Sequence, residues 1–458
     1  MSNSRPLTII ILAAGKGTRM HSQKPKVLHA LAGKPLLHHV ISTVKQLAPQ
    51  KIIVVYGFGG EAVPATFADE DITWVKQADQ LGTGHAVQQA VPHLGTDGVS
   101  LVLLGDVPLI DAGSCEQLLA SAQDGLALMS VNKADPAGYG RIVRDAQDKV
   151  MAIVEHKDAT EAQRTICEVN TGIMAMPNAR LRTWLQRLSN NNSQQEYYLT
   201  DIIGMAVEDG LTVHAEITQD EWNVTGINSK QDLATLERIY QRRQAEQLLA
   251  KGVALADPSR IDIRGELVTG SDVEIDVGCI FEGRVELADG VRIGPYCVIS
   301  DAAIGSGTIV AAFTHMEQVT IADGCRIGPY ARLRPGTQLG AEAHIGNFVE
   351  LKNSQVDRGS KINHLSYVGD TSVGKQVNIG AGTITCNYDG ANKYRTEIGD
   401  NAFIGSNTQL VAPVTVGEGA TIGAGSTLTQ DAPANQLTIA RARQVSIANW
   451  KRPLKKPR

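Results

Sequence analysis

Residues 321–351 read IADGCRIGPYARLRPGTQLGAEAHIGNFVEL, in which an aliphatic residue recurs at every sixth position. A second series follows the same period closer to the carboxyl end of the chain. The two series comprise Ile321, Ile327, Leu333, Leu339, Ile345 and Leu351, and then Ile398, Ile404, Leu410, Val416, Ile422 and Leu428. A hexapeptide period is the signature of a β-helix, because each hexapeptide forms one short strand and a turn. The sequence therefore predicts a left-handed parallel β-helix of hexapeptide repeats.

The repeat also predicts the size of this β-helix. Three hexapeptides close one triangular coil around the aliphatic side chains, so about 18 residues form a coil and residues 265–430 form roughly nine, stacked about 4.8 Å apart. The period breaks at residues 385–396, where a polar loop contains Asn387 and Tyr388. Insertions in repeat proteins collect on the binding face, so this loop is a candidate site. On periodicity alone, a spacer or assembly module is an equally good interpretation.

The chain before residue 230 has a different pattern. Short apolar runs at 8–13, 52–56 and 100–104 end in glycine or aspartate and precede helical segments, which predicts an α/β domain with a Rossmann-like mixed sheet. Residues 229–251 contain neither glycine nor proline and predict one amphipathic helix. We therefore expect a first domain at 1–229, a helical linker at 230–251 and the β-helix domain, with a basic tail, at 252–458.

The bulk composition excludes several classes of protein. With 458 residues, 43% hydrophobic and 20% charged, the chain is long enough for two globular domains. A net charge of -5 gives no general attraction to nucleic acid or to an anionic membrane. The six scattered cysteines suit free thiols in a reducing compartment, and the short apolar run at 7–14 predicts a strand, not a signal peptide or anchor. We expect a cytoplasmic protein without nucleic-acid or membrane partners.

Two segments of the first domain could bind a nucleotide. The glycine-rich turn LAAGKGTRM at 12–20 can bring backbone N–H groups close to a phosphate, with Lys16 and Arg19 adding charge. Asp106 ends an apolar run, and at the carboxyl end of a parallel strand its carboxylate would suit Mg²⁺. Taken alone, a turn of this kind is more often structural, and Asp106 could equally cap the following helix.

Further motifs give these segments a context. The turn is followed by PKVL at 25–28, GKPL at 33–36 and QADQLGTGHA at 77–86, and together they resemble the nucleotidyltransferases that make nucleoside diphosphate sugars. The last motif is similar to the loop that reads uracil in the uridylyltransferases, which implies UTP as co-substrate. The resemblance implies a nucleotide site at Leu12, Ala13, Ala14, Gly15, Arg19, Lys26, Gln77, Gly82, Thr83, Leu104, Gly105 and Asp106, with Asp106 and Asn228 as Mg²⁺ ligands.

Three more segments match the sugar pocket of the same enzymes. They are GYGRI at 138–142, IVEHKD at 153–158 and EVNTG at 168–172. The resemblance implies that Gly140, Glu155, Asn170 and Asn228 bind an acetamido sugar. The chain departs from the pattern at Leu104, where close relatives would have a tyrosine, so a contact made by that ring would be lost.

The β-helix carries a second candidate site. NFVELK at 347–352 and NHLSYVGD at 363–370 place His364 among Arg334, Lys352, Tyr367 and Asn378. Neighbouring cations favour the neutral imidazole that a general base needs. A histidine at a surface turn is the alternative when the residue is considered alone.

With both halves present, residues 8–453 resemble the family of bifunctional bacterial N-acetylglucosamine-1-phosphate uridyltransferases and glucosamine-1-phosphate acetyltransferases. The resemblance implies that His364 is the catalytic base and that Arg334, Lys352, Tyr367 and Asn378 bind glucosamine 1-phosphate. It implies an acetyl-CoA site at Ala381, Asn387, Tyr388, Ser406, Ala424 and Arg441. A homotrimer of packed β-helices is also implied.

The expected function is therefore the synthesis of UDP-N-acetylglucosamine, a precursor of bacterial peptidoglycan and lipopolysaccharide. Acetyl transfer from acetyl-CoA to glucosamine 1-phosphate comes first, and UMP transfer from UTP to the product follows, with release of pyrophosphate. One alternative is a nucleotidyltransferase whose β-helix only regulates or assembles it, which the residues around His364 disfavour. A noncatalytic regulatory subunit is the second, which Asp106 with Asn228 disfavours.

Overall fold

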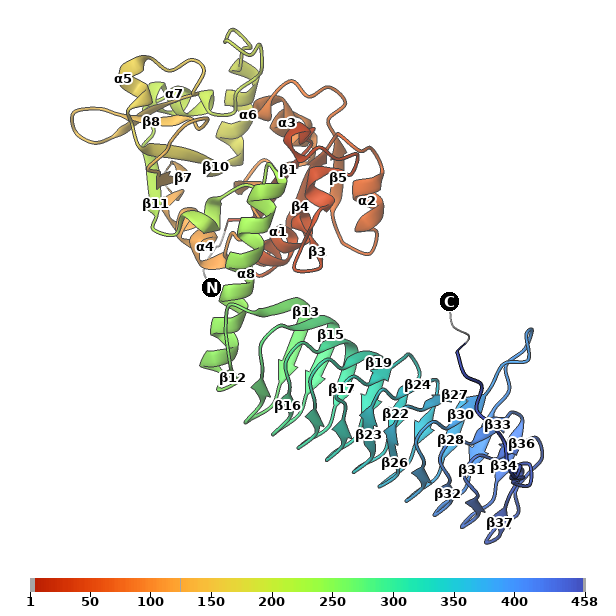
Figure 1. Ribbon diagram of the computed structural model, residues 1–458. Coiled ribbons are helices and arrows are strands. Elements are labelled where there is room, and N and C mark those ends of the chain that lie inside the picture. Colours follow the sequence, from red (N-terminus) through yellow and green to blue (C-terminus); the bar gives the residue numbers. More distant parts are fainter. Residues whose placement is uncertain (1–4, 124, 456–458) are drawn as a thin grey trace. The chain divides into compact units, whose positions relative to one another are not determined.

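The computed structural model describes residues 5–123 and 125–455 and consists of two compact units, Met1–Tyr240 and Gln241–Arg458 (Figure 1). Their boundary falls inside a single helix, α8 (Lys230–Ala250), where the sequence predicts one. Leu236, early in α8, is buried in a small core of the first unit, whereas Ala245 and Leu248 are buried in the core of the second. Each half of the helix thus belongs to a different core. The expected domain limits at 229 and 252 stay a prediction.

The first unit is built on a mixed sheet, as the alternation of apolar runs predicts. Its main path runs β11-β7-β10-β6-β1-β4-β5, and β8 and β9 extend it beside β10. The strands are β1 (Leu7–Ala13), β4 (Lys51–Tyr56), β5 (Thr73–Lys76), β6 (Val99–Leu104), β7 (Leu126–Asn132), β8 (Arg141–Arg144), β9 (Val150–Val154), β10 (Glu168–Pro177) and β11 (Val213–Thr218). β10 runs antiparallel to β6 and β7, while β4, β1 and β6 are parallel. The carboxyl ends of these parallel strands therefore meet at one edge of the sheet.

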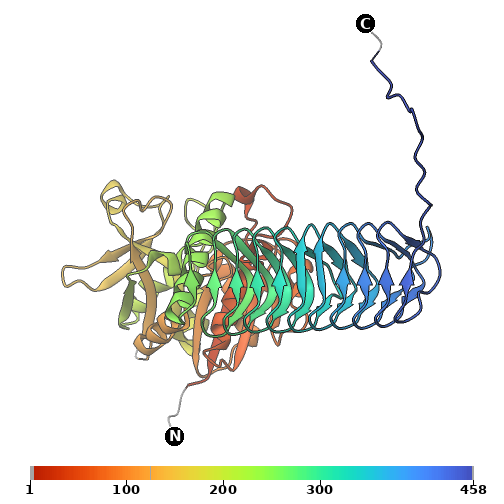
Figure 2. The same cartoon turned by 60° about the horizontal axis from the view of Figure 1, so that its bottom comes forward.

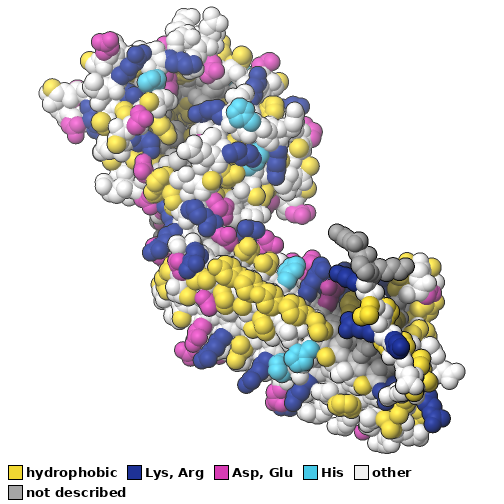
Figure 3. All heavy atoms as spheres, in the orientation of Figure 1, with side chains coloured by type: hydrophobic (Ala, Val, Ile, Leu, Met, Phe, Trp, Pro, Cys, Tyr) yellow, Lys and Arg dark blue, Asp and Glu magenta, His cyan; other side chains and the backbone are white. Residues whose placement is uncertain are grey.

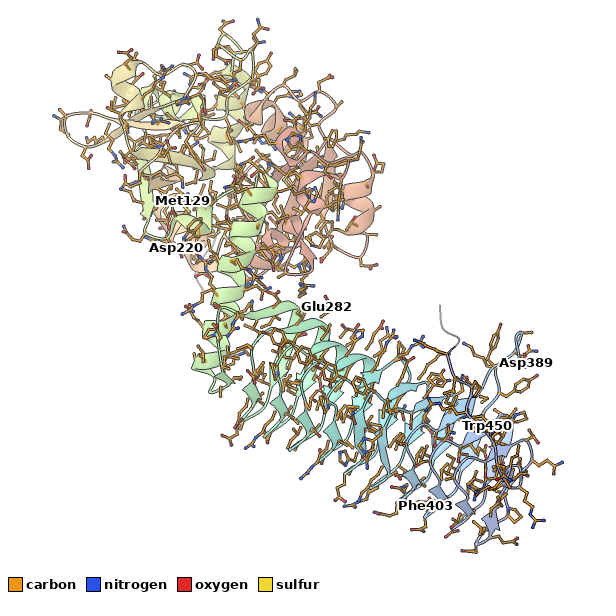
Figure 4. The ribbon with its side chains drawn as sticks, in the orientation of Figure 1. Met129, Asp220, Glu282, Asp389, Phe403 and Trp450 are labelled. Atoms are coloured by element: carbon orange, nitrogen blue, oxygen red, sulfur yellow. The ribbon has the colours of Figure 1, made fainter. Side chains whose placement is uncertain are left out.

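Helices bury their apolar faces on both sides of this sheet, which separates two cores. In α1, for example, buried side chains recur on one face from Leu36 to Val44. The other helices are α2 (Ala62–Thr66), α3 (Thr83–Ala90), α4 (Ala112–Ser121), α5 (Glu161–Arg164), α6 (Asn178–Arg187) and α7 (Asp201–Glu208), with α1 at Leu36–Lys45. Four 3₁₀ turns and a two-strand pair complete the unit: η1 (Thr18–Met20), η2 (Lys26–Leu28), η3 (Val91–His93), η4 (Glu221–Val224), β2 (Ala30–Leu31) and β3 (Lys34–Pro35). Met129, on β7, lies in one of the two cores (Figure 4).

The second unit is the predicted β-helix, whose coils lie on one another in register (Figure 2). One face is an 11-stranded parallel sheet: β12 (Ala254–Leu255), β14 (Glu274–Ile275), β16 (Arg292–Ile293), β18 (Ile309–Val310), β20 (Arg326–Ile327), β23 (His344–Asn347), β26 (Lys361–His364), β29 (Asn378–Ile379), β32 (Phe403–Ile404), β35 (Thr421–Ile422) and β37 (Leu437–Thr438). The nine strands from β14 to β35 fall within residues 265–430, in agreement with the expected number of coils. The fold class predicted from the sequence is confirmed.

The other two faces share a 15-stranded sheet. Its long strands are β13 (Ile261–Thr269), β15 (Cys279–Leu287), β17 (Val298–Ile304) and β19 (His315–Ile321). Beyond β19 it divides into two paths, one of β21 (Arg332–Leu333), β24 (Glu350–Lys352), β27 (Tyr367–Gly369), β30 (Ile384–Cys386), β33 (Gln409–Val411) and β36 (Thr427–Leu428), and one of β22 (Gln338–Leu339), β25 (Gln355–Val356), β28 (Thr371–Val373), β31 (Thr396–Ile398) and β34 (Val414–Val416). In the first coils one long strand thus covers both of these faces, whereas beyond β19 each coil contributes a separate strand to each.

The aliphatic residues of the hexapeptide period form the core of the β-helix. In the 11-stranded sheet Ile327 pairs with Ile345, and Ile404 pairs with Ile422, each step spanning one coil. All four are buried. Between Ile379 and Ile404 the register step is longer, because residues 387–395 leave the stack as a loop. Asp389, in the first half of this loop, lies on the part that projects away from the coils (Figure 4).

Two expectations about the chain's environment can be compared with the structure. All six cysteines are free. Among residues 5–123 and 125–455, no helix has both the length and the apolar character required to span a bilayer.

The buried aliphatic residues of the hexapeptide period lead to a first prediction about stability. Ile327→Ala leaves a cavity in a close-packed core and should lower the free energy of unfolding by about 2–5 kcal/mol. Arg326→Ala, at the exposed neighbouring position of β20, should change it by less than about 0.5 kcal/mol. Chemical unfolding of both variants, followed by circular dichroism, measures the difference. Equal costs at the two positions would contradict the assignment of Ile327 to the core.

Candidate active sites

A cavity of about 460 Å³ opens at the carboxyl ends of β1 and β6. It is lined by ten of the twelve predicted nucleotide-binding residues: Leu12, Ala13, Ala14, Gly15, Lys26, Gln77, Gly82, Thr83, Leu104 and Asp106. Lys16 and Glu196 also line it. Gly105 lies just behind the lining and donates its N–H to the Leu12 carbonyl at 2.9 Å. Arg19 is exposed on η1 and is not among the lining residues, so Lys16 is the nearer cation of that turn.

The predicted base-reading loop is held by hydrogen bonds and by one glycine. Gln77 is buried, and its side-chain N–H₂ donates to the Gly82 carbonyl at 3.1 Å and lies 3.1 Å from His85 Nδ1. Gly82 has a φ of 105°, and a Cβ there would lie 2.6 Å from the Tyr197 carbonyl oxygen. The loop therefore needs glycine to approach the segment that contains Tyr197. The position of His85 between two glutamine amides agrees with a structural role.

The two residues expected to bind Mg²⁺ converge on one cation of the chain itself. The Lys26 ammonium forms an ion pair with Asp106 Oδ2 and donates to Asn228 Oδ1 at 3.2 Å. The side chains of Lys26 and Asp106 are only 13% and 14% exposed. A carboxylate and an amide oxygen that both reach one cationic atom are a hard-ligand pair, and Mg²⁺ is usually bound by one or two carboxylates plus substrate phosphates. Asp106 and Asn228 therefore fit a magnesium site that a substrate completes.

Three of the four predicted sugar-binding residues, Gly140, Glu155 and Asn170, meet where β8, β9 and β10 pair, whereas the fourth, Asn228, lies beside Lys26. The Asn170 N–H donates to the Gly140 carbonyl at 2.9 Å, and a Cβ on Gly140 would lie 3.4 Å from Glu155 Oε1. Thr200 donates a hydrogen bond to Glu155 at 3.1 Å. Burial, together with the charges of Asp201, Asp158 and Glu196, raises the pKa of Glu155. Glu196 lines the nucleotide cavity and Thr200 reaches Glu155, so residues 196–200 connect the two predicted subsites.

The β-helix aligns the predicted acetyltransferase residues in a column. Asn347, His364, Ala381, Ser406 and Ala424 each stand two residues after a core isoleucine in successive coils of the 11-stranded sheet. The column is continuous through the turns, because each carbonyl from Asn347 to Ser406 accepts an N–H from the next coil; the donors are Leu365, Gly382, Asn407 and Gly425, at 2.7–3.3 Å. Arg441 donates to the carbonyl of Ala424. The order of the chain thus places His364 directly beside the row expected to bind acetyl-CoA.

The position directly after each residue of this column forms a corner of the coil, and the size of its side chain changes along the stack. In earlier coils it carries Tyr296, Phe313, Tyr330 and Phe348, whose rings stack face to face with centroids 4.9–5.3 Å apart. In later coils the same corner carries Gly382, Asn407 and Gly425. All of these residues have positive φ, which glycine and asparagine adopt most readily. The bulky row thus ends where the predicted acetyl-CoA row begins.

The predicted anion-binding cations lie on the neighbouring face. Arg334 and Lys352 are in register in adjacent coils, where Arg334 pairs with Glu350 at 3.0 Å and Lys352 lies 3.9 Å from Asp370. Tyr367, on β27, is separated from His364 by a two-residue corner. Asn378 lies on β29, in the 11-stranded sheet, and so on a different face from Arg334 and Lys352.

Two residues at this face were not predicted from the sequence. The neighbouring ammonium of Lys393, together with burial and the charge of Arg334, lowers the pKa of Lys352 against the opposing effect of Asp370. Burial would raise the pKa of Asp370, but hydrogen bonds from Asn353 and Asn387 and the two lysine charges outweigh it and lower the pKa. The signal for Lys393 was present, because it belongs to the loop that breaks the hexapeptide period. Asp370 shows no comparable signal.

The loop itself is ordered by its own backbone. Asn387 is buried and donates to Asp370, while Tyr388 is 59% exposed. The N–H of Tyr394 donates to the Asn387 carbonyl at 2.9 Å, which closes the base of the loop. The two predicted acetyl-CoA residues of the loop therefore face different surroundings, one in the cation cluster and one in solvent.

Comparison with known proteins identifies the family. Residues 9–252 match the MobA-like NTP transferase domain, and residues 318–353 and 395–430 match the bacterial transferase hexapeptide family. The chain is 70% identical to the bifunctional protein GlmU of Methylobacillus flagellatus over 98% of each chain. It is 60% identical to that of Azoarcus over 98% of this chain and 100% of the relative, and 59% identical to that of Nitrosospira multiformis over 99% of each. The chain belongs to the GlmU family.

Membership of the GlmU family confirms the resemblance found in the sequence. The relatives match over nearly their full length, so both modules of a GlmU protein are present. The predicted enzyme class is confirmed as well: a nucleotidyltransferase joined to a hexapeptide-repeat acyltransferase.

Glu155 generates a prediction about pH in this GlmU protein. Because its pKa is raised in the folded state, the folded form holds the proton more tightly than the unfolded form, and stability is lost as pH rises through the raised pKa. Glu155→Gln retains an oxygen acceptor for Thr200 without the charge. Its melting temperature relative to wild type should therefore be higher at pH 8 than at pH 5, as measured by calorimetry. Exposed Glu116→Gln on α4 is the control, and an unchanged difference at both pH values for Glu155→Gln would contradict the shift.

Proposed function

We propose that the two units catalyse consecutive steps of UDP-N-acetylglucosamine synthesis, uridyl transfer within residues 1–229 and acetyl transfer within residues 252–458. The β-helix first acetylates glucosamine 1-phosphate with acetyl-CoA. The first unit then transfers UMP from UTP to the resulting N-acetylglucosamine 1-phosphate and releases pyrophosphate. The observation that carries this proposal is that polar side chains meet around Lys26 and Asp106 in one unit and around His364 in the other, in a chain that matches a GlmU protein over 98% of its length.

In the uridyltransferase site the cavity residues bind and orient the two substrates. The glycine-rich turn at 12–15 and the Gln77 loop hold the nucleotide, and Gly140, Glu155 and Asn170 hold the acetamido sugar so that its phosphate oxygen attacks the α-phosphorus of UTP. Lys16 and Lys26 lie at the cavity and neutralise phosphate charge, and Arg19 is the second cation of the glycine-rich turn. Mg²⁺ held by Asp106 and Asn228 would supply further charge neutralisation at the transferred group.

In the acetyltransferase site Arg334, Lys352 and Tyr367 bind the phosphate end of glucosamine 1-phosphate, joined by Asn378 and by Lys393. His364 accepts a proton from the amine as the amine nitrogen bonds to the thioester carbon. The C–S bond then breaks and CoA leaves. Ala381, Ser406 and Ala424 bind acetyl-CoA along their column, with Asn387, Tyr388 and Arg441 at its sides.

A homotrimer is the assembly that we propose for this chain. Asn378 lies on a different face of the β-helix from Arg334 and Lys352, so a second copy packed alongside would bring such faces together around one small ligand. The four stacked rings from Tyr296 to Phe348 are 45–54% exposed, more apolar surface than an isolated turn requires. Hydrophobic side chains also form a band along this unit (Figure 3). A cytoplasmic location completes the proposal, because the substrates are cytoplasmic metabolites and the thiols are free.

The alternative of a single-activity nucleotidyltransferase has no support from the family comparison. Relatives that cover the whole chain are bifunctional proteins. A β-helix used only for regulation or assembly would have no need for a histidine with a dedicated ring partner beside a row of small residues.

Asp106→Ala tests the uridyltransferase site. The change removes the carboxylate that pairs with Lys26 and is expected to hold Mg²⁺, so pyrophosphate release from UTP and N-acetylglucosamine 1-phosphate should fall by at least about 10²-fold. CoA release from acetyl-CoA and glucosamine 1-phosphate should stay at the wild-type rate, and circular dichroism of the variant is the control for folding of the first unit. Retained pyrophosphate release would remove Asp106 from the site, and loss of both activities in a folded variant would contradict two independent sites.

His364→Ala tests the acetyltransferase site. Removal of a general base should slow CoA release by about 10²- to 10⁴-fold, while pyrophosphate release stays unchanged. Raising the pH should partly restore the rate, because the substrate amine then loses its proton without help. The matched control is His315→Ala, an exposed histidine on β19, which should leave both rates unchanged. Wild-type CoA release from His364→Ala would reject His364 as the base.

A further inference from the structure

Within the described part of the chain, the His364 ring has one side-chain hydrogen-bond partner, and it comes from the preceding coil. β23 and β26 are parallel strands of the 11-stranded sheet in which Asn347 pairs with His364. The side-chain oxygen of Asn347 lies 2.7 Å from His364 Nδ1, a short and therefore well-formed hydrogen bond. An amide oxygen carries no hydrogen, so Nδ1 must donate, and the neutral ring then has its lone pair on Nε2.

The backbone register between the two coils fixes this contact. The N–H of Leu365 donates to the Asn347 carbonyl at 3.1 Å, so the backbone holds the two residues side by side independently of their side chains. Glu350, an acidic residue of the same motif as Asn347, is engaged by Arg334 at 3.0 Å and by Arg332 at 3.7 Å. The ring of His364 is thus oriented by a neutral amide and not by a carboxylate.

We propose that Asn347 is a positioning residue of the acetyltransferase site, which holds His364 in the tautomer whose Nε2 can accept a proton. In the transfer, the amine nitrogen bonds to the thioester carbon, its proton passes to Nε2, and the C–S bond breaks to release CoA. Asn347 acts through the ring and does not touch the substrate. This inference rests on the proposed role of His364.

The neutral partner also affects the pH range in which the imidazole is unprotonated and can act as a base. A carboxylate beside the ring would stabilise the protonated imidazolium and keep the base protonated to higher pH, whereas an amide orients the ring without this effect. The charged and titratable groups on neighbouring strands of this sheet include His344 on β23, Lys361 on β26 and Arg326 on β20. Burial, followed by the charges of Arg326, Lys361 and His364, lowers the pKa of His344. β29, on the other side of His364, contributes Asn378 and, just beyond it, Ala381, which carry no charge.

Two substitutions at Asn347 separate positioning from structure. Asn347→Leu removes the acceptor and should lower kcat for CoA release by about 10- to 100-fold, the range typical of partners that orient a functional histidine. The KM values for acetyl-CoA and glucosamine 1-phosphate should change little, because no substrate contact is lost. Asn347→Asp keeps the acceptor and adds a charge, so the acid limb of its pH–rate profile should move up by about one pH unit. Near pH 9 the Asp variant should regain most of the wild-type rate, and the Leu variant should not.

Three measurements in the full-length protein complete the experiment. Pyrophosphate release should be unchanged in both variants, and Gln355→Leu, the same kind of change at an exposed amide on β25 of the other sheet, should leave CoA release unchanged. Equal losses in Gln355→Leu and Asn347→Leu would assign the effect to packing and overturn the proposal. It would also be overturned if Asn347→Asp had the wild-type pH profile, or if both variants had wild-type rates while His364→Ala was inactive. Wild-type CoA release from His364→Ala would instead refute the proposed role of the histidine.

Discussion

The backbone register between successive coils is the constraint on which the acetyltransferase half depends. Each coil is hydrogen-bonded to the next in parallel, and the inward isoleucines lock this pairing, because a slip by one residue would move an aliphatic side chain to the surface and a polar one into the core. Any position at a fixed distance from an inward isoleucine therefore repeats along the stack. Asn347, His364, Ala381, Ser406 and Ala424 are one such series. A site built on this series inherits the rigidity of the core.

The first unit achieves convergence by a different rule. Its parallel strands end at one edge of the sheet, so the turn after β1 and the end of β6 meet although about ninety residues separate them in the chain. Asn228 is brought to the same place by the segment before α8, where the N–H of Ile227 donates to the Asp106 carbonyl at 2.9 Å. The helix shared by the two cores thus begins at the proposed metal-binding residues of the first.

The sequence predicts periodic features well and side-chain pairings poorly, for physical reasons. A hexapeptide period of buried aliphatic residues has few alternative solutions, so the β-helix and its number of coils follow from it. The residues that line the cavity could be predicted because their motifs consist of glycines and of residues whose backbone groups are expected to contact the nucleotide. The pairing of Asn347 with His364 requires the register between coils, and a coil can hold 17 or 18 residues, so spacing alone does not determine which side chains meet. Lys393 returns to Lys352 only because the loop closes at Tyr394, and Arg19 lies outside the cavity because η1 leaves it exposed.

Several cations assigned to phosphate binding are paired with carboxylates in this structure. Lys26 pairs with Asp106, Arg334 with Glu350, and Lys352 with Asp370. Such pairs hold long, flexible side chains in one place, which reduces the entropy lost when a phosphate binds. They also mean that a substrate phosphate must compete with a carboxylate or share the cation with it. The way in which a phosphate could replace the carboxylate at the cation differs between the two sites. A metal ion on Asp106 would take over the carboxylate and free the Lys26 ammonium for the triphosphate, whereas Glu350 and Asp370 have no such competitor. Because the proposed acetyltransferase cations are partly neutralised, we expect selectivity there to depend on the fixed positions of Tyr367, Asn378 and the His364 ring more than on charge.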